Sequence, residues 1–124
     1  RDGENAMQRD EAERTALHLG VIGGHRGVVE ALLEGSNAVG QLVLARDEDS
    51  YTCLHFAAQH GHTDLMDMLV QVGGEPLINA RTAMHAWTAL EVAKRAGQSE
   101  AGKKLKGYAL GESKGGMGSW IKGM

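Results

Sequence analysis

The chain has 124 residues, of which 42% are hydrophobic and 23% are charged, with a formal net charge of −3. This length allows one small domain with a single core, and no apolar run approaches the roughly 20 residues that a membrane-spanning helix needs. Cys53 is the only cysteine, which excludes an intramolecular disulfide and favours an intracellular, reducing compartment. Because the chain starts with Arg1 and not with Met, we expect either a fragment or the product of N-terminal processing, and we keep an organellar location as an alternative.

Charge is distributed unevenly. Residues 1–93 hold six Lys and Arg against fourteen Asp and Glu, whereas residues 94–124 hold seven against two. A protein that tracks a nucleic-acid backbone needs a basic face, so the acidic body argues against a nucleic-acid partner.

A pattern repeats along the chain. TALH at 15–18 recurs 37 residues later as TCLH at 52–55, and the weaker copy TALE follows 36 residues further on, at 88–91. The Gly-His pair at 24–25 recurs at 61–62, again with an offset of 37. Such constant offsets predict three tandem structural units.

Each copy predicts two short helices. In the second copy, LHFAA at 54–58 places apolar residues at i, i+3 and i+4 of a first helix, which Gly61 ends. Thr63 then caps a second helix, which stops at Gly73-Gly74. Because neither helix is long enough to be stable alone, we expect successive copies to stack, joined by extended linkers.

Two segments, TALHLGVIGGHRGVVEALLEG (15–35) and TCLHFAAQHGHTDLMDMLVQVGG (52–74), resemble the ankyrin repeat in their Thr-x-Leu-His, Gly-His and paired apolar signatures. TALEVAKRAGQ (88–98) is similar to the variant that often closes such arrays. The resemblance implies an all-α, helix-turn-helix solenoid of about three repeats with extended linker fingers. Its divisions would be a cap segment at 1–12, a repeat domain at 13–106 (13–46, 47–80 and 81–106), and an extended glycine-rich tail at 107–124.

The chain departs from the family pattern in its linkers and turns. The linkers run about three to four residues beyond the usual period. Where the family usually has a turn glycine, this chain has Glu13, Ser50 and Ala86, which disfavour positive φ. We therefore expect irregular turns in the fingers. Cys53 takes the place of the family's proline, which predicts a small buried thiol.

Three histidines fall within eight residues, at His55, His60 and His62, and raise the question of a metal or catalytic cluster. In the structural interpretation, a threonine caps each first helix and the histidine three residues later bonds back to it, which accounts for His18 and His55. His25 and His62 would satisfy backbone groups at the turn between helices. A metal-dependent enzyme at His60 and His62 is the remote alternative, because no third ligand is placed beside them. The residues expected to be structural are Thr15, His18, His25, Thr52, His55, Gly61, His62 and Thr88.

With no catalytic constellation, cofactor or metal predicted, we assign function to exposed surfaces. The resemblance implies a concave protein-binding wall made by the first helices and by fingers at 45–51 and 79–87. These fingers carry Arg, Tyr and Trp, the types most often found as binding anchors, although Tyr51 and Trp87 could instead cover the interface between repeats. The predicted partner-binding residues are Arg46, Asp47, Glu48, Asp49, Tyr51, Phe56, Gln59, His60, Arg81, Met84, His85 and Trp87.

The glycine-rich tail raises a second possibility for function. Its scattered apolar and aromatic residues have little reason to exist in a segment exposed only to water. The alternative is a plain disordered end. We expect instead that the tail docks into a partner, through Tyr108, Leu110, Met117, Trp120 and Ile121. The sequence thus predicts a non-catalytic protein–protein interaction module, a scaffold or adaptor. The alternative is a permanent accessory subunit of a large multi-subunit complex, organellar or not, with the tail docked into its neighbours.

Overall fold

The computed structural model describes residues 9–35 and 38–110. Three helix pairs are present: α2 (Ala16–Ile22) with α3 (Arg26–Gly35), α5 (Cys53–His60) with α6 (Thr63–Ile78), and α7 (Ala89–Arg95) with α8 (Ser99–Leu110). A further helix, α4 (Val39–Leu44), connects the first pair to the second. The part of the chain that is described contains helices and loops and no strand, so the predicted all-α fold is confirmed.

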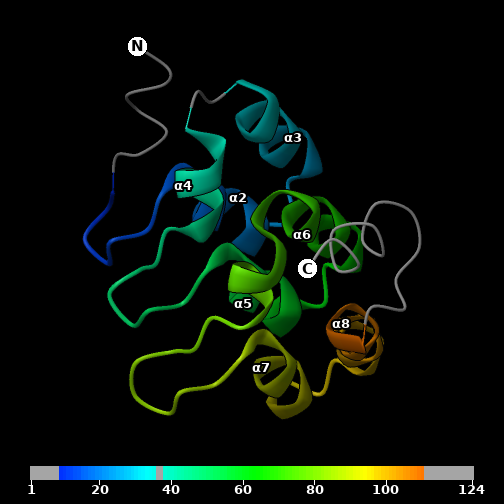
Figure 1. Ribbon diagram of the computed structural model, residues 1–124. Coiled ribbons are helices and arrows are strands. Elements are labelled where there is room, and N and C mark those ends of the chain that lie inside the picture. The colour runs from blue at the N-terminus through cyan, green and yellow to red at the C-terminus, as the bar shows by residue number, and fades with distance from the viewer. Residues whose placement is uncertain (1–8, 36–37, 111–124) are drawn as a thin grey trace.

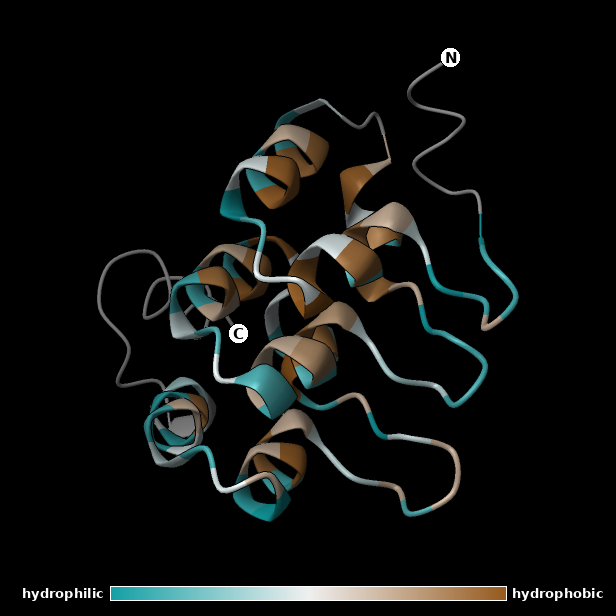
Figure 2. Ribbon diagram, turned by 180° about the vertical axis from the view of Figure 1, so that it is seen from behind, coloured by the Kyte–Doolittle hydropathy of each residue, from teal (hydrophilic) through white to brown (hydrophobic). Residues whose placement is uncertain are grey.

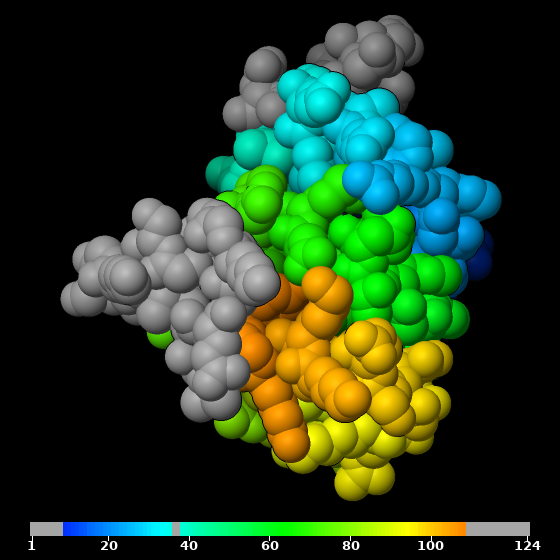
Figure 3. Space-filling view, turned by 90° about the vertical axis from the view of Figure 1, so that its right-hand side faces the viewer, coloured from blue at the N-terminus to red at the C-terminus, as the bar shows by residue number. Residues whose placement is uncertain are grey.

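The helix pairs stack in chain order. The inner helix α5 packs against both α2 and α7, and α6 packs against α8. In the space-filling view, the second pair accordingly lies between the first and the third (Figure 3). Three loops project from one side of the stack (Figure 1), and they are more hydrophilic than the helix faces that meet inside it (Figure 2).

The core is built from the apolar face of every helix pair. Leu17 of α2, Leu54 of α5 and Leu69 of α6 are all completely buried. Burying such a side chain contributes about 1.5–3 kcal/mol, whereas short helices of this kind are marginal in isolation. The stacking interfaces between pairs are therefore the main source of stability.

Each first helix begins with the same local device, and a glycine with positive φ lies at or just after its end: Gly24, Gly61 and Gly97. Thr15, Thr52 and Thr88 are the N-caps of α2, α5 and α7, and each makes a capping box with the residue three positions later. Gly61, the C-cap of α5, takes a left-handed conformation with φ of 72°. Thr63 differs from expectation, because it is the first residue of α6 and His62 holds the cap position without a side-chain hydrogen bond.

The linkers between repeats were expected to be extended, but they contain helical turns. In the first linker, α4 buries Leu42 and Val43. In the second, Gly74 breaks α6 with φ of 63° and ψ of −151°, and a further turn then buries Leu77. Gly73 permits the close packing, since a Cβ there would lie 3.0 Å from Cγ1 of Val43. The additional linker residues are thus used to extend the core.

Cys53 lies beneath the first linker, as the predicted buried thiol. Its Sγ donates to the carbonyl oxygen of Val43 at 3.3 Å, and only 1% of the residue is exposed. Burial raises the pKa of the thiol to about 12. A group that stays protonated at neutral pH is a poor nucleophile, so Cys53 acts in packing.

Two domain boundaries differ from the sequence prediction. Residues 10–12 of the expected cap segment form a turn of the first finger, in which Ala12 accepts a backbone hydrogen bond from Glu48. The last helix, α8, continues to Leu110, beyond the expected boundary at 106. None of the helices in the described residues is long and apolar enough to cross a membrane.

Candidate functional site

The candidate site is the surface formed by three fingers, residues 9–14, 45–51 and 79–87, together with the exposed C-terminal ends of α5 and α7. We call this surface the finger face. The fingers lie next to one another along the stack, on the side opposite α3 and α8 (Figure 1).

The turns of the fingers are regular, contrary to expectation. Glu13, Ser50 and Ala86 all adopt positive φ, at 65°, 63° and 54°. Such a conformation costs a residue with a side chain roughly 1–2 kcal/mol, so other interactions must offset it. In the second finger, Oδ1 of Asp47 accepts hydrogen bonds from the backbone N–H groups of Asp49 and Tyr51, both at 2.9 Å.

The third finger uses a different residue for the same purpose. Thr82 takes the place of the aspartate, and its Oγ1 accepts from the backbone N–H of Trp87 at 3.1 Å. The backbone N–H of Thr82 in turn donates to the carbonyl oxygen of Trp87 at 3.0 Å. These two bonds close the finger at its base and fix the backbone of Trp87.

A row of arginines joins the fingers. Nη1 of Arg9 donates to the carbonyl oxygens of Glu13 and Arg46, at 2.9 and 2.6 Å. Arg46 donates to the carbonyl of Arg81 at 2.9 Å, and Arg81 donates to that of Ala86 at 2.8 Å. Arg46 and Arg81, both predicted to bind a partner, are exposed, but Arg46 already joins the second finger to the third, and Arg81 bonds within its own finger. The spacing of Arg9, Arg46 and Arg81, at offsets of 37 and 35, is close to the repeat period and could have indicated this row from the sequence.

Two buried histidines connect the second and third fingers to the repeats that precede them. Nε2 of His18 lies 3.2 Å from the carbonyl oxygen of Tyr51, and Nε2 of His55 lies 2.9 Å from that of Trp87. Because a carbonyl can only accept, Nε2 carries the proton in both rings. Nδ1 of His55 is then an acceptor, 3.0 Å from the backbone nitrogen of Thr52.

Both rings are held neutral by this arrangement. Burial lowers the pKa of His18 and of His55, and in both cases it outweighs the hydrogen bonds that favour the charged form. Protonation would also place a donor at Nδ1, facing the N–H of the capping threonine. The two histidines are therefore fixed as neutral connectors and are not available for metal or proton chemistry in the folded chain.

The third repeat replaces this histidine with Glu91. Its Oε1 accepts from the backbone N–H of Thr88 at 3.0 Å, which completes the capping box. Among the described residues no further finger follows, so a histidine reaching outward would have no carbonyl to bind. Glu91 instead lies 3.9 Å from the guanidinium of Arg81.

Two of the predicted partner-binding residues are buried, which corrects the expectation that they face a partner. Asp47 is 7% exposed, its carboxylate occupied by its own turn and lying 3.6 Å from Nε of Arg14. Phe56 is 6% exposed and makes ring contacts with His18 and Tyr51. Both side chains are enclosed by the first two fingers.

The other predicted residues lie on the surface to different degrees. Tyr51 is half-buried against His55 and Phe56, so it covers the repeat interface, the alternative considered from the sequence. The exposed residues are Arg46, Glu48, Asp49, Gln59, His60, Arg81, Met84 and His85.

The third finger displays an ordered aromatic and cationic cluster, which we call the Trp87 cluster: Met84, His85, Trp87 and Arg95. The rings of His85 and Trp87 stack with centroids 4.2 Å apart, and the guanidinium of Arg95 lies 4.5 Å from the Trp87 ring centre. Met84 is 86% exposed. Arg95 was not among the residues predicted from the sequence. The signal for it was its position 36 residues after Gln59, which was predicted to face this surface.

His60 and His62 stack on each other, with ring centroids 5.9 Å apart. The ring of His62 also lies against Gly24 of the preceding repeat, where a Cβ would come within 2.9 Å of Cε1. Neither His25 nor His62 makes a ring hydrogen bond within the described residues, so packing replaces the backbone bonds that we expected. In the same part of the chain, no three His, Cys, Asp or Glu side chains gather where they could hold a metal.

The structure corrects the prediction that Tyr108 docks into a partner. Tyr108 lies in α8, is 2% exposed, and donates a hydrogen bond to Asp67 of α6. Burial, together with this carboxylate, raises the pKa of its phenol. Leu110 ends α8, and its side chain lies outside the described part, as do Met117, Trp120 and Ile121.

Comparison with protein families agrees with this architecture. Residues 13–47 match a family described as ankyrin repeat, and residues 37–93 match one described as ankyrin repeats in many copies. Together the two matches cover the first two repeats and most of α7. Among the curated proteins, none matches the chain.

Proposed function

Because the chain belongs to the ankyrin-repeat family, whose members generally mediate interactions between proteins, we propose that it is a non-catalytic module that binds a protein partner through the third finger. The Trp87 cluster carries this proposal. Stacked His85, Trp87 and Arg95 form a surface whose geometry is set before a partner arrives, which lowers the entropy cost of binding.

The composition of the cluster supports the same assignment. Trp and Arg are the residue types most often found as binding anchors, and methionine adapts to the shape of a partner. Met84 and His85 are exposed and fill no part of the core. The backbone of Trp87 is fixed by Thr82 and His55, and its half-buried ring packs against His85 and Arg95, so both parts of the residue are held in place.

The experiment is affinity isolation with the whole chain from its native source. The test variant is Met84→Ala with Trp87→Ala, and the matched control is Val28→Ala with Val72→Ala, two exposed apolar residues on the outer helices α3 and α6. We expect the test variant to lose the partner that the unaltered chain and the control retain. Retention of the same partner by the test variant would overturn the proposal.

A photoreactive residue placed at position 84 locates the contact directly. Cross-linking to the partner from position 84, and not from position 28, is expected. The same isolation addresses the accessory-subunit alternative. A fixed set of neighbours that survives loss of the Trp87 cluster but not loss of residues 111–124 would favour that alternative.

A further inference from the structure

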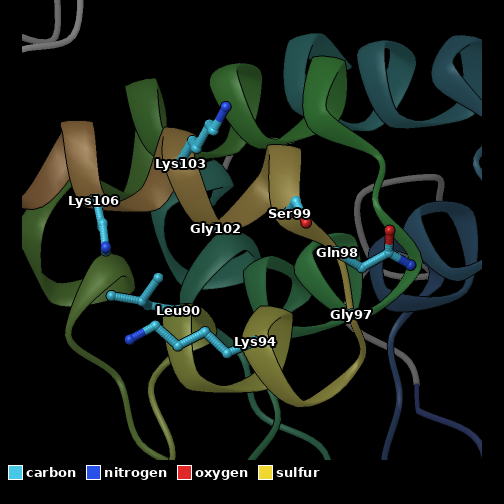
Figure 4. A pocket seen from close by; sticks show the side chains of 8 residues that line it. All are labelled: Leu90, Lys94, Gly97, Gln98, Ser99, Gly102, Lys103 and Lys106. Carbon is cyan, nitrogen blue, oxygen red and sulfur yellow. The ribbon is translucent and has the colours of Figure 1, made fainter.

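A groove of about 280 Å³ lies between α7 and α8, in the last helix pair of the stack (Figure 4). Leu90 lies in it beside Gly102, and Lys94, Lys103 and Lys106 also line it. None of the described residues that line the groove is acidic. The groove therefore combines an apolar floor with charge of a single sign.

The position of the groove in the repeat explains its apolar floor. Leu90 stands 36 residues after Leu54 and takes the equivalent place in its own repeat. Leu54 is completely buried because α7 packs against α5, whereas Leu90 is only partly buried, since the described residues place no further repeat over it. The groove is thus the surface on which another repeat would stack.

Lysines replace apolar residues at two further positions of this surface. Lys94 corresponds to Ala58, and Lys106 corresponds to Val70, both completely buried in the second repeat. In Figure 4, Lys94 and Lys106 extend toward the same side of Leu90, while Lys103 points away from it. The charged ends of Lys94 and Lys106 are thereby brought to the same part of the groove.

Within the described chain, no acidic side chain pairs with the lysines that line the groove. Lys104 pairs with Asp67 at 2.9 Å, but Lys94, Lys103 and Lys106 have no ion pair among the described residues. Soluble surfaces generally intersperse charges of both signs, whereas the charged residues that line this groove are all lysines. A cleft with charge of one sign instead attracts ligands of the opposite sign.

We propose that this groove binds an acidic peptide segment of a protein partner. Carboxylates of the segment contact Lys94 and Lys106, and an apolar side chain between them covers Leu90. The chain's own residues 111–124 carry two lysines and one glutamate, so their charge does not complement the groove. A nucleic acid would meet an acidic body beyond it, with fourteen Asp and Glu in residues 1–93.

The probe is a short fluorescent peptide in which glutamates flank one leucine, bound to the whole chain and followed by anisotropy. The test variant is Lys94→Gln with Lys106→Gln. The matched control is Gln41→Glu with Gln71→Glu, two exposed sites away from the groove that change the net charge by the same amount. We expect the test variant to raise the dissociation constant about three- to tenfold, with a much smaller effect of the control.

A second variant tests the groove without changing charge. A Cβ on Gly102 would lie 3.9 Å from Cδ1 of Leu90, an ordinary contact, so the first side-chain atom of Gly102→Leu fits, and the rest of the leucine should extend into the groove. We expect an unchanged or higher melting temperature and weaker peptide binding. Replacing glutamate by glutamine in the peptide should also weaken binding.

Several results would overturn the proposal. These are equal losses in the test and control variants, undiminished binding by Gly102→Leu, and tighter binding to phosphatidylserine vesicles than to the peptide. Concentration-dependent self-association that the lysine variant abolishes would point to a second copy of the chain instead. The Met84 and Trp87 variant should bind the peptide normally, so this test and that of the finger face can fail separately.

Discussion

Nε2 of His55 donates a hydrogen bond of 2.9 Å to the carbonyl oxygen of Trp87, and this bond joins the second repeat to the third finger. The same ring accepts from the backbone N–H of Thr52 at its other nitrogen. One side chain therefore starts α5 and positions the residue at the centre of the proposed binding surface. Local folding and the finger face are coupled through it.

Stability should decrease as the pH falls below the ordinary histidine pKa of 6.5. His18 and His55 have lowered pKa values in the folded chain, because burial disfavours their charged forms. Well above pH 6.5 both rings are neutral in the folded and unfolded chains, so their contribution to stability is complete. Below it the unfolded chain binds protons first, and the free energy of unfolding falls. Urea unfolding at about pH 7.5 and about pH 5.5 measures this difference.

The double variant His18→Gln, His55→Gln should reduce that pH dependence. Glutamine can complete the capping box but cannot also reach the carbonyl of the next finger, so each change should cost about 1–3 kcal/mol at neutral pH. His25→Gln is the matched control, since His25 is exposed on a turn. A double variant with the same slope as the unaltered chain would contradict the role given to the buried rings.

Ala86→Gly should stabilise the chain by about 1 kcal/mol. Ala86 has φ of 54°, a conformation that glycine adopts without steric cost. Ala83→Gly is the control in the same finger, because Ala83 is not among the residues with positive φ. Thermal unfolding should show a higher melting temperature for the first variant only. A decrease for Ala86→Gly would mean that the lost entropy of the loop outweighs the relieved strain.

Ending the chain after residue 106 should destabilise it far more than ending it after residue 110. The shorter form loses Tyr108, whose burial and bond to Asp67 hold α8 against α6. Removing a buried aromatic side chain costs about 3–5 kcal/mol. Tyr108→Phe keeps the ring and should cost only about 1 kcal/mol. Equal melting temperatures for the two shortened forms would show that Tyr108 does not belong to the core.

Thiol reagents should modify Cys53 only when the chain opens. The thiol is buried beneath α4, with its pKa raised to about 12, so little thiolate exists at neutral pH in the folded state. Labelling with a maleimide should be slow in buffer and rapid in concentrated urea. Because Cys53 is the only cysteine, the labelling rate can be followed by mass spectrometry. Rapid labelling in buffer would indicate that the first linker opens locally.

The repeat architecture followed from the sequence because its signals are local. A threonine with His or Glu three residues later, and a glycine about two turns on, define each first helix within ten residues of chain. The helical turns at Val39–Leu44 and after Gly74 were not predicted from the sequence. Their apolar runs are short, and they become helical only because Leu42 and Leu77 pack into the core. The positive φ of Ser50 was also unforeseen, since its strain is offset by the carboxylate of Asp47.

The sequence alone determined that three helix pairs stack and that polar residues and glycines begin and end the first helix of each pair. These properties depend on the repeat period and on residues that are neighbours along the chain. Only the tertiary structure decided which polar and aromatic residues are already occupied. Arg46, Asp47 and Tyr108 looked available, but they bind groups elsewhere in the fold or in their own turn. Partners 35 residues away for Arg46 and 41 for Tyr108 are set by how the repeats pack. The same packing left Met84, His85 and Arg95 exposed beside Trp87, and it left the lysines of the groove exposed.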